Sequence, residues 1–132
     1  MPIDLADAVQ DAIFSALNVP ALTALAPVRQ HVRQGTEPPL VIVAEIDLSP
    51  EGGKDGGIDR ATVTVLTYVR EPRRAALLEL MAKVRELLDG GDISAAGAVL
   101  SPPVLENQTG GLMEDGQTYE GTQTFGLFVQ AA

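Results

Sequence analysis

Residues 71–91 read EPRRAALLELMAKVRELLDGG, and this stretch decides the fold. Apolar side chains recur in it every three or four residues, which places them on one face of a helix. They are Leu77, Leu80, Met81, Val84, Leu87 and Leu88. Pro72 suits the first turn, where its missing N–H is not needed, and Gly90-Gly91 supplies the left-handed residue that commonly ends a helix. A helix with one apolar face predicts a sheet for it to pack on.

Two predicted strands precede this helix and two follow it. The first pair is Leu40–Asp47 and Ala61–Val69, which alternate or run apolar and are rich in β-branched residues. The second pair is Ala98–Asn107 and Tyr119–Gln130. Pro102-Pro103 cannot donate ladder hydrogen bonds, so the strand that contains it should be bent or lie at an edge.

A first helix is predicted over residues 4–18, with Leu5, Val9, Ile13 and Leu17 on one face. A short helical turn is expected at Pro20–Leu25, and residues 28–35 fit either an extended or a helical piece. The predicted fold class is therefore α+β: a mainly antiparallel four-stranded sheet with helices packed on one face, in the order α-β-β-α-β-β. At 132 residues the chain is most simply one domain, residues 1–132.

Two polar, glycine-bearing segments are expected to be flexible loops, near residues 49–59 and 108–117. The first holds four glycines between residues 52 and 57 and is far longer than a hairpin requires. Length without a need in folding often indicates contact with another molecule. Phe128 is a further signal, because it falls on the otherwise polar face of the last predicted strand.

Composition and charge exclude several classes of function. The chain has no cysteine, and no apolar run long enough for a membrane span, so we expect a soluble protein made in a cytoplasm. The net charge of −9 is uneven: residues 1–28 carry three acids and no bases, residues 29–85 nine bases and eight acids, and residues 86–132 seven acids and no Lys or Arg. Acidic termini repel phosphate, which disfavours direct DNA binding.

No residue set predicts catalysis, a cofactor or a metal. His31 is the single histidine and has no catalytic signature around it. Lys54 lies in the glycine-rich loop, but the phosphate-binding pattern G-x-x-x-x-G-K-[ST] is absent. Glu114, Asp115 and Glu120 lack the spacing of a calcium loop and fit a solvated turn better.

The order of segments resembles the tail-terminator or tail-completion proteins of long-tailed bacteriophages and phage-like gene-transfer particles. The similar blocks are residues 19–25 after the first helix, residues 34–43 with their proline-marked strand, residues 63–74 from a strand into the long helix, and residues 115–119 before the last strand. The resemblance, taken over the order of all segments, covers nearly the whole chain. Order and spacing, more than any one block, carry the resemblance.

The resemblance implies a structural virion protein and not an enzyme. Such proteins form a ring, here expected to be hexameric, that caps the tail tube, ends its elongation and forms the surface that joins the head or neck. The implied partners are further copies of the chain, the major tail tube protein and a neck or head-completion protein, with DNA only passing through the lumen and no membrane contact. The implied location is the head-proximal end of the virion tail, after assembly in the host cytoplasm.

Residues in the two loops and on the last strand are the interface candidates. They are Glu51, Lys54, Asp55, Asp59, Arg60, Met113, Glu114 and Phe128. Two alternatives remain open at this stage. One is a neck, head-closure or other minor tail protein, and the other is a small enzyme or ligand-binding domain with a carboxylate site near Glu114 and Asp115.

Overall fold

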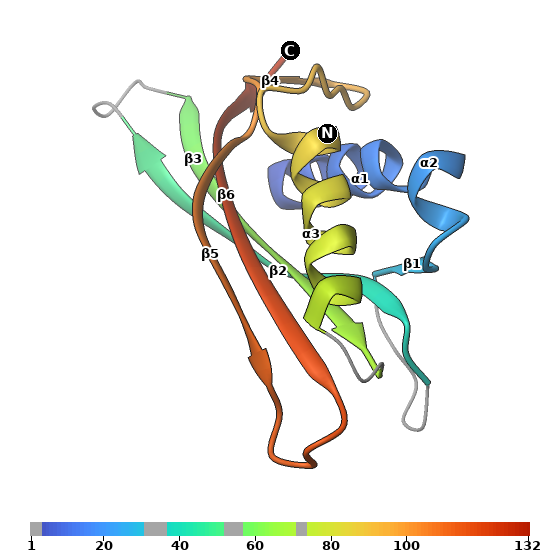
Figure 1. The fold of residues 1–132 in the computed structure, drawn as a ribbon. Helices are drawn as coiled ribbons and strands as arrows, with labels where there is room; N and C mark the ends of the chain where they lie inside the picture. The colour runs from blue at the N-terminus through green and yellow to red at the C-terminus, as the bar shows by residue number, and fades with distance from the viewer. Residues whose placement is uncertain (1–3, 31–36, 52–56, 71–73) are drawn as a thin grey trace.

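The computed structural model describes residues 4–30, 37–51, 57–70 and 74–132. Three helices lie together on one side of a strongly twisted sheet, and the long β5–β6 hairpin extends beyond the other strands at one end (Figure 1). The elements in chain order are α1 (Leu5–Leu17), α2 (Pro20–Thr23), β1 (Val28–Arg29), β2 (Leu40–Glu51), β3 (Ile58–Val69), α3 (Arg74–Leu88), β4 (Ala98–Leu100), β5 (Val104–Leu112) and β6 (Tyr119–Ala131). This is an α+β fold, as predicted.

The sheet has the order β1-β2-β3-β6-β4, and β5 also pairs with β6. All pairs are antiparallel except β1 with β2. Odd-numbered residues of β3 and β6 face the helices and are mostly buried apolar residues, such as Val63, Val65 and Phe125. Even-numbered residues face the opposite way. We call that second side the outer face.

Both long helices form where the sequence predicts them. Asp4 caps α1, because its carboxylate accepts hydrogen bonds from the N–H groups of Ala6 and Asp7 at 3.0 and 3.3 Å. Gly90 ends the α3 segment with a φ of 73°, the left-handed conformation that glycine adopts without strain. Pro72, expected in the first turn, lies outside the described residues.

Helix α3 packs closely on the β5–β6 ribbon because two paired glycines leave room for it. Gly110 and Gly121 are opposite each other in the register, and both face α3. A Cβ atom at Gly121 would overlap Met81 Sδ and lie 3.0 Å from the Cγ and Cε atoms of Met81. Met81 fills the space that the two missing side chains leave, so the glycines set how near the helix can come to the sheet.

A buried amide joins the same three elements. Gln123 on β6 is fully buried, and its Nε2 donates to the Met81 carbonyl of α3 and to Gln108 Oε1 of β5, both at 2.9 Å. Gln123 Oε1 has no hydrogen-bond partner among the described residues. One side chain therefore fixes α3, β5 and β6 relative to one another.

The observed sheet differs from the predicted four strands in two places. The predicted strand Ala98–Asn107 is two strands, β4 and β5, because Pro102-Pro103 interrupts the ladder and Ser101 instead bonds β6 at Phe128. Residues 28–35, for which the sequence allowed an extended or a helical piece, contribute β1. This short strand is parallel to β2, and its Val28 pairs with Val41. The predicted order α-β-β-α-β-β therefore lacks β1 and the division of one predicted strand into β4 and β5.

The two predicted loops are shorter than expected. In the first segment, residues 49–51 belong to β2, which ends at Glu51, and residues 58 and 59 belong to β3, which begins at Ile58. Residues 52–56 between them lie outside the described residues. The second segment is strand as far as Leu112, because residues 108–112 pair with β6. Only Met113–Thr118 forms the turn. Glycine and polar composition suggested a loop there, but Gly110 serves the contact with α3.

Candidate assembly surfaces

Exposed apolar side chains gather in three places on the described surface. Eight large hydrophobic residues are exposed, and they are Leu25, Ile58, Leu78, Val99, Val104, Leu112, Met113 and Phe128. Four lie at one end of the sheet, two at the hairpin tip and two on the helical side. Grouped exposed apolar residues are typical of protein contact sites, whereas scattered ones are not.

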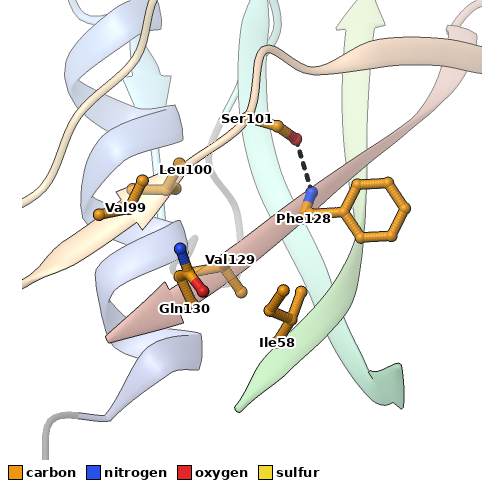
Figure 2. A pocket seen from close by; sticks show the side chains of 7 residues that line it. All are labelled: Ile58, Val99, Leu100, Ser101, Phe128, Val129 and Gln130. Atoms are coloured by element: carbon orange, nitrogen blue, oxygen red, sulfur yellow. Dashed lines mark hydrogen bonds between the residues drawn. The ribbon is translucent and has the colours of Figure 1, made fainter. Parts of the chain in front are cut away.

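The first group is the end surface, which we define as Ile58, Val99, Val104 and Phe128. All four are at outward-facing register positions, on β3, β4, β5 and β6 respectively. Phe128 is 48% exposed and Val104 58% exposed. Figure 2 shows Ser101 beside the strand at Phe128, where the Ser101 hydroxyl accepts from the Phe128 N–H at 2.7 Å. A hollow of about 180 Å³ is lined by residues of β3, β4 and β6 and by Ser101.

An ion pair borders the end surface. Arg60 of β3 reaches Glu106 of β5 across the intervening strand β6, and the two side chains meet over Gly126. A Cβ atom at Gly126 would overlap the Glu106 carboxylate and lie 3.0 Å from Arg60 Nη2. Gly126 thus provides the space in which the pair forms. Because both side chains are about a third exposed, we assign the pair a small share of stability, roughly 0.2–1 kcal/mol.

The second group is the tip surface, Leu112 and Met113, at the protruding end of the β5–β6 hairpin (Figure 1). Hydrogen bonds fix the turn that presents it. The Met113 N–H donates to the Thr118 carbonyl at 2.7 Å, and the Gly116 N–H to the Met113 carbonyl at 3.1 Å. Asp115 accepts from the N–H groups of Gln117 and Thr118 and from the Thr118 hydroxyl, at 2.9, 2.8 and 2.6 Å. Hydrogen bonds within the turn therefore hold the tip in one conformation.

We expect Asp115 to titrate in unusually strong acid. The hydrogen bond from the Thr118 hydroxyl and those from the two backbone N–H groups lower the pKa of Asp115 to about 2. A lowered folded pKa means that the contribution of Asp115 to turn order is present above its ordinary value of 3.8 and is lost as the pH falls through about 2. An NMR titration of the carboxyl carbon measures this midpoint. A midpoint near 3.8, or an Asp115→Ala variant with unchanged Thr118 amide protection, would contradict it.

The third place is the corner hollow, which we define as Leu25, Pro39, Val69, Ala76, Glu79 and Leu80. Its volume is about 140 Å³. It lies where β3 ends at Val69 and β2 begins just after Pro39, next to the start of α3. Exposed Leu78 of α3 belongs to the same helical side. Arg70 directly follows Val69 and forms an ion pair with Glu37.

At each lateral edge of the sheet, the outermost strand has backbone that pairs with no further strand among the described residues. Strand β5 pairs only with β6, and β2 beyond Ile42 pairs only with β3. Residues 107–112 of β5, NQTGGL, contain no charge and no proline. Proline and charge are the devices that usually stop a strand edge from pairing, so this edge is open to another strand.

Away from the end surface, the outer face of the sheet is polar and acidic. Threonines on β3 and β6 dominate its centre: Thr62, Thr64, Thr122 and Thr124. The charged residues at outward register positions of the described strands are Arg29, Glu45, Asp47, Glu51, Arg60, Glu106 and Glu120. Five acids against two bases leave this face negative.

The structure separates the predicted interface residues into two groups. Asp59, Arg60 and Phe128 lie close together, because Arg60 is opposite Phe128 in the register, and Glu51 ends the adjoining strand opposite Ile58. Met113 and Glu114 lie at the other end of β6, in the hairpin turn. Lys54 and Asp55 lie outside the described residues, as does His31.

Sequence reasoning missed the other apolar members of these surfaces. The pairing of the strands, which the sequence does not specify, is what brings Ile58, Val99 and Val104 together as one surface. Ile58 could have been found, since it continues the outward alternation of Arg60 and Thr62. Leu112 was assigned to a loop and therefore was not considered as a side chain held in a fixed direction.

The acidic residues near the tip have separate structural roles. Asp115 holds the turn, whereas Glu120 accepts a hydrogen bond from the Tyr68 hydroxyl at 2.7 Å. Burial, followed by this bond and the charge of Glu120, raises the pKa of Tyr68 to about 12. Within the described ranges no three acidic or histidine side chains are grouped so as to hold a metal ion. Nor is any described helix long and apolar enough to cross a membrane.

Comparison with known proteins defines the class. The family described as tail completion protein gp17 matches residues 5–130. The chain belongs to this family, which is a family of phage tail structural proteins. The fold also matches a chain in the solved virion of a native gene transfer agent particle, with a TM-score of 0.87, 19% identity, and coverage of 98% of this chain and 100% of that one. No curated protein sequence matches the chain.

Proposed function

We propose that this protein closes into a ring, a hexamer in our working hypothesis, that caps the tail tube at its head-proximal end. The ring ends tube elongation and forms the surface to which the neck or head-completion protein binds. Family membership and the likeness to a chain of a gene transfer agent virion support this role. In this proposal the protein acts by binding alone, without catalysis or a cofactor.

The strand order is the observation that carries the proposal. Along β2-β3-β6-β5 each strand is antiparallel to the next, so the two outer strands, β2 and β5, run in opposite directions. Rotation about an axis roughly parallel to the strands preserves their directions. The β5 edge of one copy can then meet the β2 edge of the next copy as an antiparallel neighbour. A repeated contact of this heterologous kind generates a ring when its rotation closes.

The outer face suits the wall of a channel for DNA. Helices cover the other side of the sheet, which leaves the threonine-rich outer face to line the lumen (Figure 1). Its charged residues are five acids and two bases, Arg29 and Arg60, and Arg60 is itself paired with Glu106. A negative wall does not bind phosphate, so DNA would pass through without sticking.

The end surface is the proposed contact with the tail tube. Arg60, paired with Glu106, and the end of β2 lie beside its exposed Phe128, and the glycine-rich segment that includes Lys54 and Asp55 follows β2 in the chain. Apolar contacts at the centre with charges around them are typical of specific protein interfaces. The opposite side of the ring is then available to the neck or head-completion protein.

Native mass spectrometry over a concentration series tests the ring. We expect a closed species with six times the 13.8 kDa mass of the chain, present in solution or after mixing with tail tubes. Addition of the protein to polymerising tube protein should also stop elongation. A chain that stays monomeric in both settings would overturn the proposal. A chain that binds head connectors but leaves tube growth unchanged would instead identify a neck or head-closure protein.

A further inference from the structure

We propose that the hairpin tip of each copy docks into the corner hollow of the next copy, so that the tip surface, Leu112 and Met113, locks neighbouring subunits. This inference rests on the proposed ring and identifies a specific contact within it. The contact is distinct from the pairing of strand edges, because it joins a turn to a hollow formed by residues of α3, the segment after α2 and the ends of β2 and β3.

The register places the tip and the hollow at the same end of the sheet. Tyr119, the first residue of β6, is opposite both Val69 on β3 and Leu112 on β5. The turn from Met113 to Thr118 therefore projects just past Val69, which lines the hollow. Strand β1 occupies the β2 edge at Val41 and Ile42, so β5 of one copy meets β2 of the next only beyond Ile42. The projecting tip then passes β1 to reach the neighbour's Leu25 and Pro39.

The size of the hollow suits the two apolar side chains of the tip surface. Leu112 is 52% exposed and Met113 39% exposed, and both stand on a turn that its own hydrogen bonds hold in place. The hollow is mostly apolar and holds about 140 Å³, a volume on the scale of one or two side chains. An ordered apolar projection loses little conformational entropy on docking, and methionine adapts to irregular apolar surfaces.

Charge favours one arrangement of the contact. The tip carries exposed Glu114 and Asp115, and no Lys or Arg occurs anywhere in residues 86–132. At the receiving edge Arg29 on β1 is exposed and basic, whereas Arg70 is already paired with Glu37, and Glu79 lines the hollow. Two acidic tips repel each other, whereas Arg29 attracts a tip, so charge favours the head-to-tail contact over contact between two tips.

Cysteine crosslinking provides the test, because the chain has no native cysteine. Chains with Met113→Cys are mixed with chains with Leu25→Cys, assembled, and treated with a short bis-maleimide. A third variant carries both substitutions. We expect a covalent dimer from the mixture and a ladder ending at the ring size from the double variant. The matched control combines Met113→Cys with Val99→Cys. Val99 is also exposed and apolar, but it lies on β4 beside the end of β6 that is far from the tip. This pair should give neither the covalent dimer nor the ladder.

Three outcomes decide the inference. Crosslinks between positions 113 and 25, and not between 113 and 99, support the contact. A ring that forms without the crosslink between 113 and 25 overturns the contact and leaves the ring intact. Absence of any oligomer, both in solution and on tail tubes, overturns the ring and the contact with it.

A second variant measures how much the contact contributes. The double substitution Leu112→Ser and Met113→Ser changes only exposed side chains, so each chain should keep its fold by circular dichroism. Because truncation of a central anchor typically weakens an interface strongly, we expect about a tenfold or greater rise in the concentration needed for ring formation. Ala96→Ser, at an exposed position outside the end surface, the tip surface and the corner hollow, should leave that concentration unchanged. Ring formation by the tip variant at the wild-type concentration would overturn the inference.

Discussion

Substitution of Gln123 by glutamate is expected to destabilise the fold by roughly 3–5 kcal/mol at about pH 8, because an unpaired carboxylate buried in a protein shifts its pKa by up to 3–5 units. Gln123 is fully buried, and its Nε2 donates to two acceptors, the Met81 carbonyl and Gln108 Oε1. An ionised carboxylate has no proton to donate to either of them. Its negative charge would instead face two oxygen atoms.

The effect of this substitution should depend on pH in a defined direction. Burial raises the folded pKa of the new carboxyl above its unfolded value of about 4.3. The unfolded state therefore releases the proton first, and the stability deficit relative to wild type grows as the pH rises from about 4.3 to the folded pKa, above which it stays constant. Below about pH 4.3 the protonated acid can donate one hydrogen bond, and the deficit should be small. Urea unfolding of both proteins at several pH values measures the difference.

Gln123→Leu is the matched control. It removes the hydrogen bonds together with the buried Oε1 that has no described partner, while the Met81 carbonyl remains within its helix and Gln108 is exposed. Replacement of buried polar groups by an apolar group of similar shape is often nearly neutral, so we expect a change within about 1 kcal/mol. A deficit of the glutamate variant that did not vary with pH, or that the leucine variant equalled, would contradict the assignment of the effect to buried charge.

The helices were predictable from the sequence because their signals are local. The apolar spacing of residues 77–88 and the glycine at position 90 specify α3 without reference to the rest of the chain. Asp4 likewise marks the start of α1. The long strands β2, β3 and β6 were also predicted, since alternation in each reflects burial on one side. Their pairing order depends on distant contacts, and no local pattern encodes it.

The ribbon of β5 and β6 shows why the remaining strands could not be predicted. Residues 108–112 look like a loop, because glycine and polar residues are depleted in strands. In the structure the same residues pair with β6, and Gly110 faces Leu77 and Met81 of α3. A Cβ atom at Gly110 would lie 3.1 Å from Leu77 Cδ2, so packing against α3 favours glycine there, and only the neighbouring helix reveals this. Composition alone cannot distinguish that requirement from a turn.

The interface candidates were predictable only where a local pattern marks the residue. Phe128 breaks a local alternation, so the sequence identifies it as an outward apolar residue, and the structure confirms its exposure. The corner hollow combines Leu25, Val69 and Leu80, which lie far apart in the chain. Such a surface forms only when the tertiary fold brings its residues together.

Substitution of Gly121 by valine should destabilise the fold by about 3 kcal/mol, the upper part of the range for overpacking a tight core. A Cβ atom at this position would overlap Met81 Sδ, and Met81 is almost fully buried between α3 and the ribbon. The two γ-methyl groups of valine require still more space. Either Met81 leaves its position or α3 moves away from the sheet, and in both cases the core loses contacts. Chemical denaturation of the purified variant measures the loss.

Gly111→Val is the control, because no atom lies within 4 Å of the corresponding Cβ position and valine favours strands. We expect that variant to be as stable as wild type or slightly more stable. A double-mutant cycle of Gly121→Val with Met81→Ala then identifies the clash. If the Met81 side chain is the group in conflict with the new valine, the two substitutions together should destabilise less than the sum of their separate effects, by about 1 kcal/mol or more. Additive effects would place the strain elsewhere, and the paired glycines would then not be what sets the distance between α3 and the sheet.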